Sequence, residues 1–149
     1  MVEEIFCKDK EFIKWRTSAK YLNIIENFSL SEACAKGQLI KKSISRNIWS
    51  INIGGEEYIL KILFCNTIID RIKALFYQKS SIEWNNLKKL YFMNFPVPEP
   101  IAVGKKGLVS FIIIRKLLNT KQLKEYCEEQ ITLEKRFALS INLANLMSE

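Results

Sequence analysis

The chain contains no histidine, and its four cysteines are scattered along 149 residues. Cys7, Cys34, Cys65 and Cys127 form no CxxC pair, so neither a Cys/His zinc site nor a Cys-His nucleophile can be assembled. The missing histidine also excludes a Ser-His-Asp triad and the most common general base. We expect reduced, partly buried thiols and no metal site within this chain.

Long apolar runs are missing as well, since no stretch approaches the roughly 18 to 20 residues of a membrane span. The first residues, MVEEIFCKDKEF, are charged where a signal peptide would be apolar. With 48% hydrophobic and 26% charged residues, the chain is long enough for one domain with a core of its own. We therefore expect a soluble, cytoplasmic domain.

Acidic residues are outnumbered, with 16 Asp and Glu against 23 Lys and Arg and a formal net charge of +7. This balance favours an anionic partner: a nucleotide, a nucleic acid, a phosphorylated sugar or the anionic surface of a membrane. The nine Phe, five Tyr and three Trp residues do not interleave with a basic strand, and most follow core periodicity. We therefore expect no nucleic-acid partner.

Proline and glycine are few, and their positions mark turns. All three prolines lie in NFPVPEP, at positions 96, 98 and 100, where they end a helix and impose an extended path. Gly54-Gly55 predicts a tight β-hairpin over residues 47–63. Lys105 to Gly107 predicts a second hairpin turn, between a strand at 101–104 and an apolar strand at 108–114.

Lys61 interrupts the otherwise apolar return strand of the first hairpin, Tyr58-Ile59-Leu60-Lys61-Ile62-Leu63. An ammonium group is costly there without an anionic partner. One interpretation is that Lys61 extends along apolar surface and reaches water at a sheet edge. The other is that Lys61 faces a cleft and holds phosphate, oriented by a carboxylate from the following helix.

Helical periodicity begins at Thr67 and continues, after an interruption at Ser80-Ser81, through IEWNNLKKLYFM. Glu83 is the only carboxylate of this second run. It fits the last position of a capping box that begins at Ser80, and equally a partner for Lys61. The sequence leaves both alternatives open.

The first 36 residues predict short helices between about Phe6 and Ser31, then a helix SEACAK capped by Ser29 or Ser31 and ended by Gly37. A strand and a basic turn follow in GQLIKKSISRN. This turn lacks the glycines of a phosphate-covering loop, so any phosphate contact there needs the side chains of Lys41, Lys42 or Arg46. A solvated basic turn is the alternative.

Three strands, a helix, a proline-marked crossover, two strands and further helices follow one another in this order. The segments RNIWSINIGGEEYILKIL, SSIEWNNLKKLYFMNFPVPEPIAVG and SFIIIRKLLNTKQLKEY resemble the bacterial lipopolysaccharide kinase family, which phosphorylates Kdo or heptose sugars of the inner core. The resemblance covers about residues 37–149. It implies an α+β fold: a protein-kinase-like small lobe with a mostly antiparallel five-stranded sheet, a long helix of the αC type and C-terminal helices.

The resemblance also implies a binding site for ATP. Lys61 would bind the α- and β-phosphates, Glu83 would hold Lys61, and Arg115 to Leu117 would be the hinge whose backbone meets the adenine edge. The apolar residues implied around the purine are Ile40, Ile48, Ile59 and Ile114. The acceptor would be the lipopolysaccharide core or another anionic glycolipid, with peripheral contact at the inner membrane.

Kinase-like folds carry the acceptor-orienting aspartate and the acidic Mg²⁺ ligand in the large lobe. The chain has only Asp9 and Asp70, both outside the expected cleft, so we expect no catalytic residue here and Mg²⁺ binding only with a large lobe. We expect a helical extension at 1–36, the small lobe at 37–118, and a linker with the start of a large lobe at 119–149, inactive alone. The alternatives are a small basic nucleic-acid-binding domain and a noncatalytic interaction domain.

Overall fold

The computed structural model describes residues 4–9, 11–68, 79–117 and 141. The chain divides into two compact units, Met1–Lys116 and Leu117–Glu149, and the elements below belong to the first. The predicted linker and C-terminal helices lie outside the described residues, except for Ile141, which is helical. Within the described part of the chain, every helix is too short or too polar to cross a bilayer.

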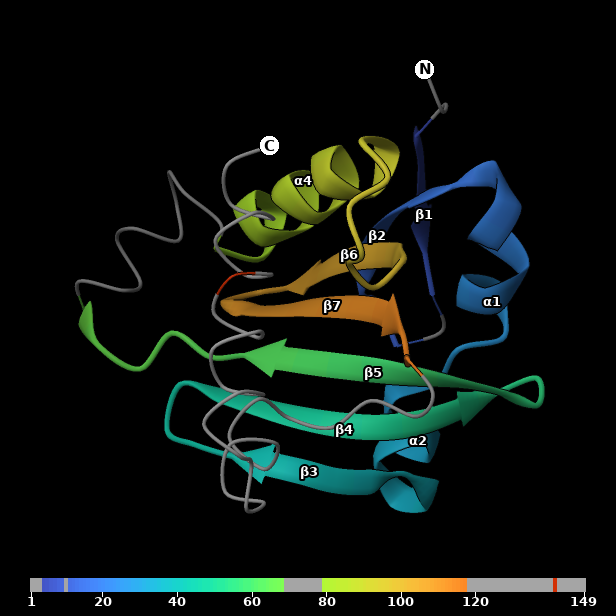
Figure 1. The fold of residues 1–149 in the computed structure, drawn as a ribbon. Helices are drawn as coiled ribbons and strands as arrows, with labels where there is room; N and C mark the ends of the chain where they lie inside the picture. The colour runs from blue at the N-terminus through green and yellow to red at the C-terminus, as the bar shows by residue number, and fades with distance from the viewer. Residues whose placement is uncertain (1–3, 10, 69–78, 118–140, 142–149) are drawn as a thin grey trace, which may run out of the picture. The chain divides into compact units, whose positions relative to one another are not determined.

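One antiparallel sheet of seven strands forms the first unit, in the order β1-β2-β6-β7-β5-β4-β3 (Figure 1). The mixed α+β class agrees with the prediction, whereas the sheet has two more strands than the five expected. The strands are β1 (Glu4–Lys8), β2 (Lys14–Ser18), β3 (Gln38–Lys42), β4 (Arg46–Ile53), β5 (Glu56–Leu63), β6 (Pro100–Lys106) and β7 (Val109–Arg115).

The additional strands, β1 and β2, occupy a region for which the sequence analysis expected only helices. Trp15 and Thr17 are buried between exposed or half-buried neighbours, the alternation of a strand covered on one face. The Asp9 carboxylate closes the β1–β2 turn by accepting hydrogen bonds from Ile13 N (2.8 Å) and Trp15 Nε1 (2.8 Å). Helical structure begins only at η1 (Ala19–Tyr21) and α1 (Leu22–Glu26).

The glycine turns have the predicted geometry. Gly54 and Gly55 have φ values of 62° and 88° and join β4 to β5 in a two-residue loop, because Ile53 pairs directly with Glu56. Gly107 has a φ of 59° in the β6–β7 turn, which consists of Gly107 and Leu108 and not of Lys105 to Gly107 as predicted, because β6 continues through Lys106. These positive angles favour glycine and hold the hairpins in one register.

The capping signals were correct for one helix and wrong for another. Helix α2 (Leu30–Lys36) is capped by the Ser29 side chain and ends at Gly37, as predicted. Helix α4 (Lys79–Phe92) contains both Ser80 and Ser81, so there is no interruption at these residues. Most of the helical run expected from Thr67 lies outside the described residues.

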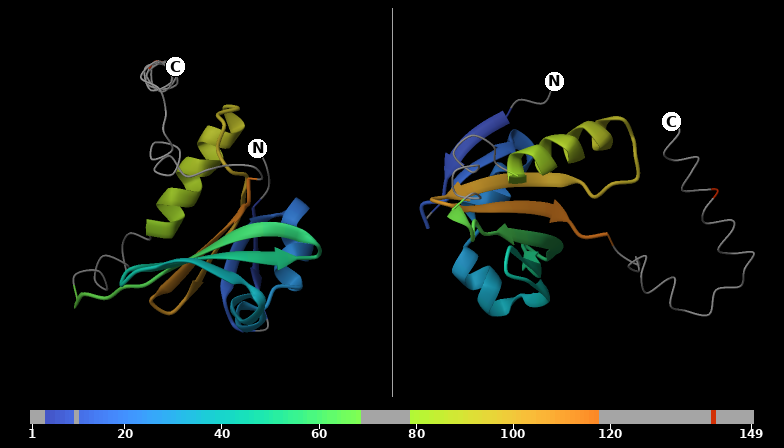
Figure 2. Two further views of the ribbon diagram at one scale, coloured as in Figure 1. Left: turned by 60° about the horizontal axis from the view of Figure 1, so that its bottom comes forward. Right: turned by 90° about the vertical axis from the view of Figure 1, so that its left-hand side faces the viewer.

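Helices lie on both faces of the sheet (Figure 2), and each face has its own apolar core. On one face, residues of α1 and α2 pack in a hydrophobic cluster that includes Trp15, Phe28 and Leu60. On the other face, α4 packs against β6 and β7 through Trp84, which contacts a cluster containing Val103 and Ile112. This second side is called the α4 face below.

Candidate functional site

Lys61 lies in the middle of β5 and points to the α4 face. It pairs with Ile48 of β4 on one side and with Ile112 of β7 on the other. Directly opposed residues of antiparallel strands project to the same side of a sheet. Since Ile112 is buried against Trp84 of α4, the ammonium group of Lys61 is on the helix-covered side.

A second row of residues crosses the same three strands beside the first. Ile59 pairs with Ser50 of β4 and with Ile114 of β7, and both isoleucines belong to the α4-face core. Ile48 and Ile59, both implied by the resemblance around the purine, lie on this same face in adjacent rows. Ile48 is directly beside Lys61, and Ser50, which was not among the expected site residues, is directly beside Ile59.

The ammonium group of Lys61 is ion-paired with the carboxylate of Glu83 on α4, with 2.5 Å between Nζ and Oε1. The two side chains are 23% and 36% exposed, so this pair is only half buried. Such a pair contributes at most about 1 kcal/mol to stability, which is a weak structural reason for a lysine in an apolar strand. Because Ser80 lies inside α4, the capping-box interpretation of Glu83 is wrong.

The β3–β4 turn, which the sequence analysis considered as a phosphate-covering loop, is short and closed by its own hydrogen bonds. Ser43 N donates to Arg46 O (2.9 Å), and Arg46 N donates to Ser43 Oγ (3.2 Å). Ile44 at its tip is 86% exposed. Ile40, which the resemblance implied as a residue around the purine, occupies an irregular position of β3 between the paired residues Leu39 and Lys41.

The expected hinge is only partly associated with this cluster. Arg115 pairs with Tyr58, whose side chain belongs to the core of the opposite face, so the Arg115 side chain points away from Lys61. Its backbone N–H donates to Glu99 O (2.9 Å), and Lys116 N–H donates to Glu57 O (3.1 Å). Both amides are thus engaged within the protein, and the Leu117 side chain is exposed.

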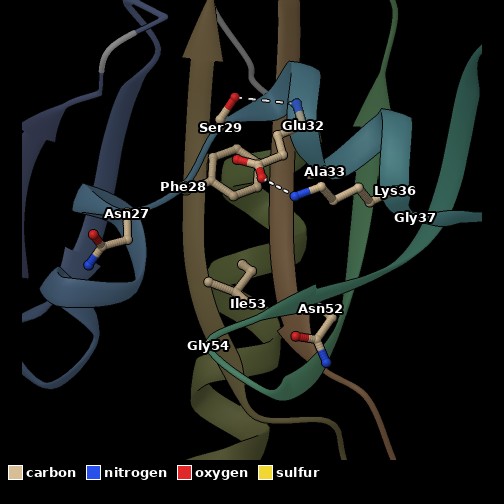
Figure 3. A pocket seen from close by; sticks show the side chains of 10 residues that line it. All are labelled: Asn27, Phe28, Ser29, Glu32, Ala33, Lys36, Gly37, Asn52, Ile53 and Gly54. Atoms are coloured by element: carbon tan, nitrogen blue, oxygen red, sulfur yellow. Dashed lines mark hydrogen bonds and ion pairs between the residues drawn. The ribbon is translucent and has the colours of Figure 1, made fainter.

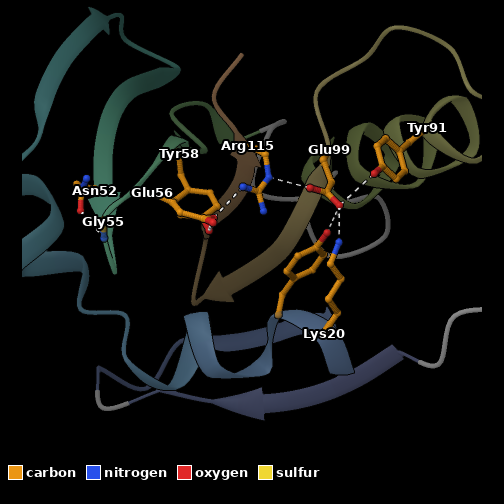
Figure 4. A network of polar contacts seen from close by, with 9 residues as sticks. Lys20, Asn52, Gly55, Glu56, Tyr58, Tyr91, Glu99 and Arg115 are labelled. Atoms are coloured by element: carbon orange, nitrogen blue, oxygen red, sulfur yellow. Dashed lines mark hydrogen bonds and ion pairs between the residues drawn. The ribbon is translucent and has the colours of Figure 1, made fainter. Parts of the chain in front are cut away.

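Arg115 instead joins a polar network centred on Glu99, which the sequence analysis missed (Figure 4). The Arg115 guanidinium bridges Glu99 Oε2 and Glu56 Oε2, each at 2.8 Å. Glu99 also accepts hydrogen bonds from Lys20 Nζ (3.0 Å) and Tyr91 Oη (3.1 Å). Tyr21 completes the group by donating its hydroxyl to Glu99.

Electrostatics in this network stabilise the ionised form of Glu99. Partial burial raises the pKa of this carboxyl, but the hydrogen bonds from Tyr21, Lys20 and Arg115 outweigh burial and lower the pKa to about 2. The Arg115 pKa is raised chiefly by its bond to Glu99. Nothing local in the sequence signals this arrangement, because the partners come from η1, α4 and β7.

Two pockets lie away from the Lys61 cluster. One of about 330 Å³ lies where α2 meets the β4–β5 turn, and the ion pair of Lys36 with Glu32 is part of its wall (Figure 3). The other, of about 340 Å³, lies between η1, the C-terminal half of α4 and the start of β6. Its lining is mostly apolar and aromatic, and it includes Tyr21, Trp84, Tyr91, Phe92, Pro100 and Ile101. Neither pocket includes Lys61 or Glu83.

The donor set on the α4 face fits an anion better than a metal ion. The described residues contain no cluster of three or more Asp, Glu, Cys or His side chains that could hold a cation. Asp9 is engaged in the β1–β2 turn, and Asp70 lies outside the described residues. The described residues around Lys61 and Glu83 therefore do not fit a Mg²⁺ site.

Comparisons of the chain with protein-family models, with curated proteins and with solved structures find no match.

Proposed function

We propose that this chain binds a nucleoside triphosphate on its α4 face, as the small lobe of a kinase-type phosphotransferase. The observation that carries the proposal is the 2.5 Å contact between Lys61 Nζ and Glu83 Oε1. Kinases hold a phosphate-binding strand lysine with a carboxylate of the next helix in this way. The sequence resemblance to lipopolysaccharide kinases supports an inner-core sugar as the acceptor.

The arrangement of elements supports the same proposal. Strands β3, β4 and β5 are followed by α4, and then by β6 and β7, which return to the same sheet beside β5. This is the chain order of a kinase-like small lobe, with β1 and β2 added beyond β6. The helix that supplies Glu83 packs on β6 and β7, on the side to which Lys61 points.

The chemistry of the cluster suits a phosphate chain beside an apolar ring. Glu83 limits the positions that the flexible Lys61 side chain can adopt, so less conformational entropy is lost when its ammonium binds phosphate. Ile59 and Ile114 provide apolar surface in the adjoining row. In this proposal ATP supplies the phosphoryl group, while these residues bind and orient it.

Binding of ATP to the full chain tests the proposal, with Lys61→Ala and Glu83→Gln as variants. Removal of the ammonium should weaken binding at least about tenfold, the scale of one charge-assisted phosphate contact. Lys88→Ala is the matched control, since Lys88 is equally buried (20% exposed) and ion-paired with Glu4 at 2.6 Å. Isothermal titration calorimetry without and with Mg²⁺ gives the affinities.

A charge reversal separates a structural from a functional role of the pair. In the double variant K61E/E83K, the ion pair can form again, so the thermal unfolding midpoint should recover relative to the single reversals. Affinity for ATP should remain lost, because the ammonium would then project from α4 rather than from β5. Unchanged ATP affinity in Lys61→Ala, or no ATP binding by the wild type, would contradict the proposal.

A further inference from the structure

We propose that Lys41 and Arg46 form a second phosphate-binding group beside Lys61 and take the place of a glycine-rich loop. The inference rests on the proposed function, because it assigns the part of the nucleotide that these two side chains would contact. It adds two residues to the site and predicts that the terminal phosphates contribute most of the affinity.

Strand register places the three cations on one face. Lys41 of β3 pairs with Ile48 of β4, which pairs with Lys61 of β5, so the two lysines flank Ile48 in one row. Arg46 pairs with Leu63, which belongs to the α4-face core. Neighbouring strands are about 4.8 Å apart, so the Lys41 and Lys61 backbones are separated by about 10 Å. Lysine and arginine side chains can bridge that separation over Ile48.

The side chains of Lys41 and Arg46 are available for a ligand. Seven cations among the described residues of the first unit already have carboxylate partners: Arg16, Lys20, Lys36, Lys61, Lys88, Arg115 and Lys116. Within the described part of the chain, the ammonium of Lys41 and the guanidinium of Arg46 have no such partner. Both residues are exposed.

The backbone of the turn is poorly suited to the same task. Phosphate-binding loops present free amide N–H groups, usually from glycine, at close range. Here Ser43 N and Arg46 N are used to close the turn. The tip is also tied to the chain after β5, because Phe64 N donates to Ser45 O (2.9 Å) and Asn66 donates to Ile44 O. Side chains must therefore supply the phosphate contacts.

Lys42 provides a matched control on the other side of the sheet. It is exposed like Lys41 but pairs with Asn47, so it projects away from the α4 face. Lys41→Gln and Lys42→Gln each remove one charge from adjacent positions of one strand. A difference in nucleotide affinity between these two variants would therefore come from the face of the sheet to which the side chain points, and not from the net charge of the protein.

The experiment measures ATP, ADP and adenosine binding to the wild type, Lys41→Gln, Arg46→Gln and Lys42→Gln. The expected result is about a tenfold loss of ATP affinity in Lys41→Gln and in Arg46→Gln, with adenosine unchanged and Lys42→Gln within about twofold of wild type. Thermal unfolding of each variant verifies that the fold is retained, as expected for exposed positions.

The two proposals can fail separately. If Lys61→Ala loses ATP binding while Lys41→Gln and Arg46→Gln do not, the nucleotide site stands and the second phosphate group is refuted. Equal losses in Lys41→Gln and Lys42→Gln would also refute it, because they would indicate general attraction of anions. If the wild type binds no ATP, both proposals fail.

Discussion

Replacement of Glu99 by glutamine should destabilise the fold and remove much of its acid sensitivity. The carboxylate accepts hydrogen bonds from Lys20, Tyr91 and Arg115 at 3.0, 3.1 and 2.8 Å, and its side chain is only 13% exposed. Glutamine keeps the shape and one acceptor. It removes the charge, however, and directs an NH₂ group at donors that cannot accept from it.

The magnitude follows from the pKa of Glu99, which is lowered from 4.5 to about 2. At about 1.4 kcal/mol per pH unit, this difference is worth up to about 3.5 kcal/mol, and solvent around Lys20 reduces our expectation to about 1.5 kcal/mol. Because the pKa is lower in the folded state, the contribution is fully present above about pH 4.5. It is lost as the pH falls from 4.5 toward 2.

Urea unfolding, followed by tryptophan fluorescence at pH values from 7 to 2.5, measures both effects. We expect Glu99→Gln to be less stable than wild type by about 1.5 kcal/mol at pH 7, and this difference to shrink to about a quarter of that value at pH 2.5. Glu32→Gln is the control, since it removes one carboxylate from an exposed pair with Lys36 and should change stability little. Equal stability of wild type and Glu99→Gln at pH 7, or a difference that persists unchanged at pH 2.5, would refute this reasoning.

Two further predictions concern the packing of Trp15. Gly104→Ala should lower the free energy of unfolding by about 2 to 4 kcal/mol, because the new Cβ would lie 2.5 Å from Trp15 Cε3. Gly54→Ala should lower it by only about 1 kcal/mol, since its Cβ meets nothing within 4 Å and only its φ of +62° is unfavourable. Thermal unfolding should show the larger loss for Gly104→Ala, and the reverse order would contradict the steric argument. Asp9→Ala should cost about 2 kcal/mol in urea unfolding, because the buried Trp15 indole N–H and the Ile13 amide lose their acceptor; an unchanged midpoint would show that water replaces the carboxylate without loss.

Local chemistry made part of the fold predictable from the sequence. The Gly54-Gly55 pair fixes one register for the β4–β5 hairpin, and Ser29 and Gly37 mark the ends of α2. Lys61 and Glu83 are 22 residues apart, yet the structure brings them together. That pairing was accessible because Glu83 is the only carboxylate in its helical run.

Features that depend on distant partners were missed. β1 and β2 have only five residues each, and Trp15 and Thr17 become recognisable as strand residues only once β6 covers the neighbouring edge. The irregularity at Ile40 reverses the side to which Lys41 points, which alternation alone cannot reveal. The role of Glu99 could not be predicted from the sequence, because its hydrogen-bonding partners are spread over separate elements.

The position of β3 at the end of the sheet has a consequence for solubility. All five of its residues are exposed, and its outer backbone groups could pair with a strand of another molecule. The ammonium groups of Lys41 and Lys42 oppose such edge-to-edge pairing, because two copies would bring like charges together, and the irregularity at Ile40 disrupts a flat template. Charged residues at this edge thus oppose the association of two copies through β3.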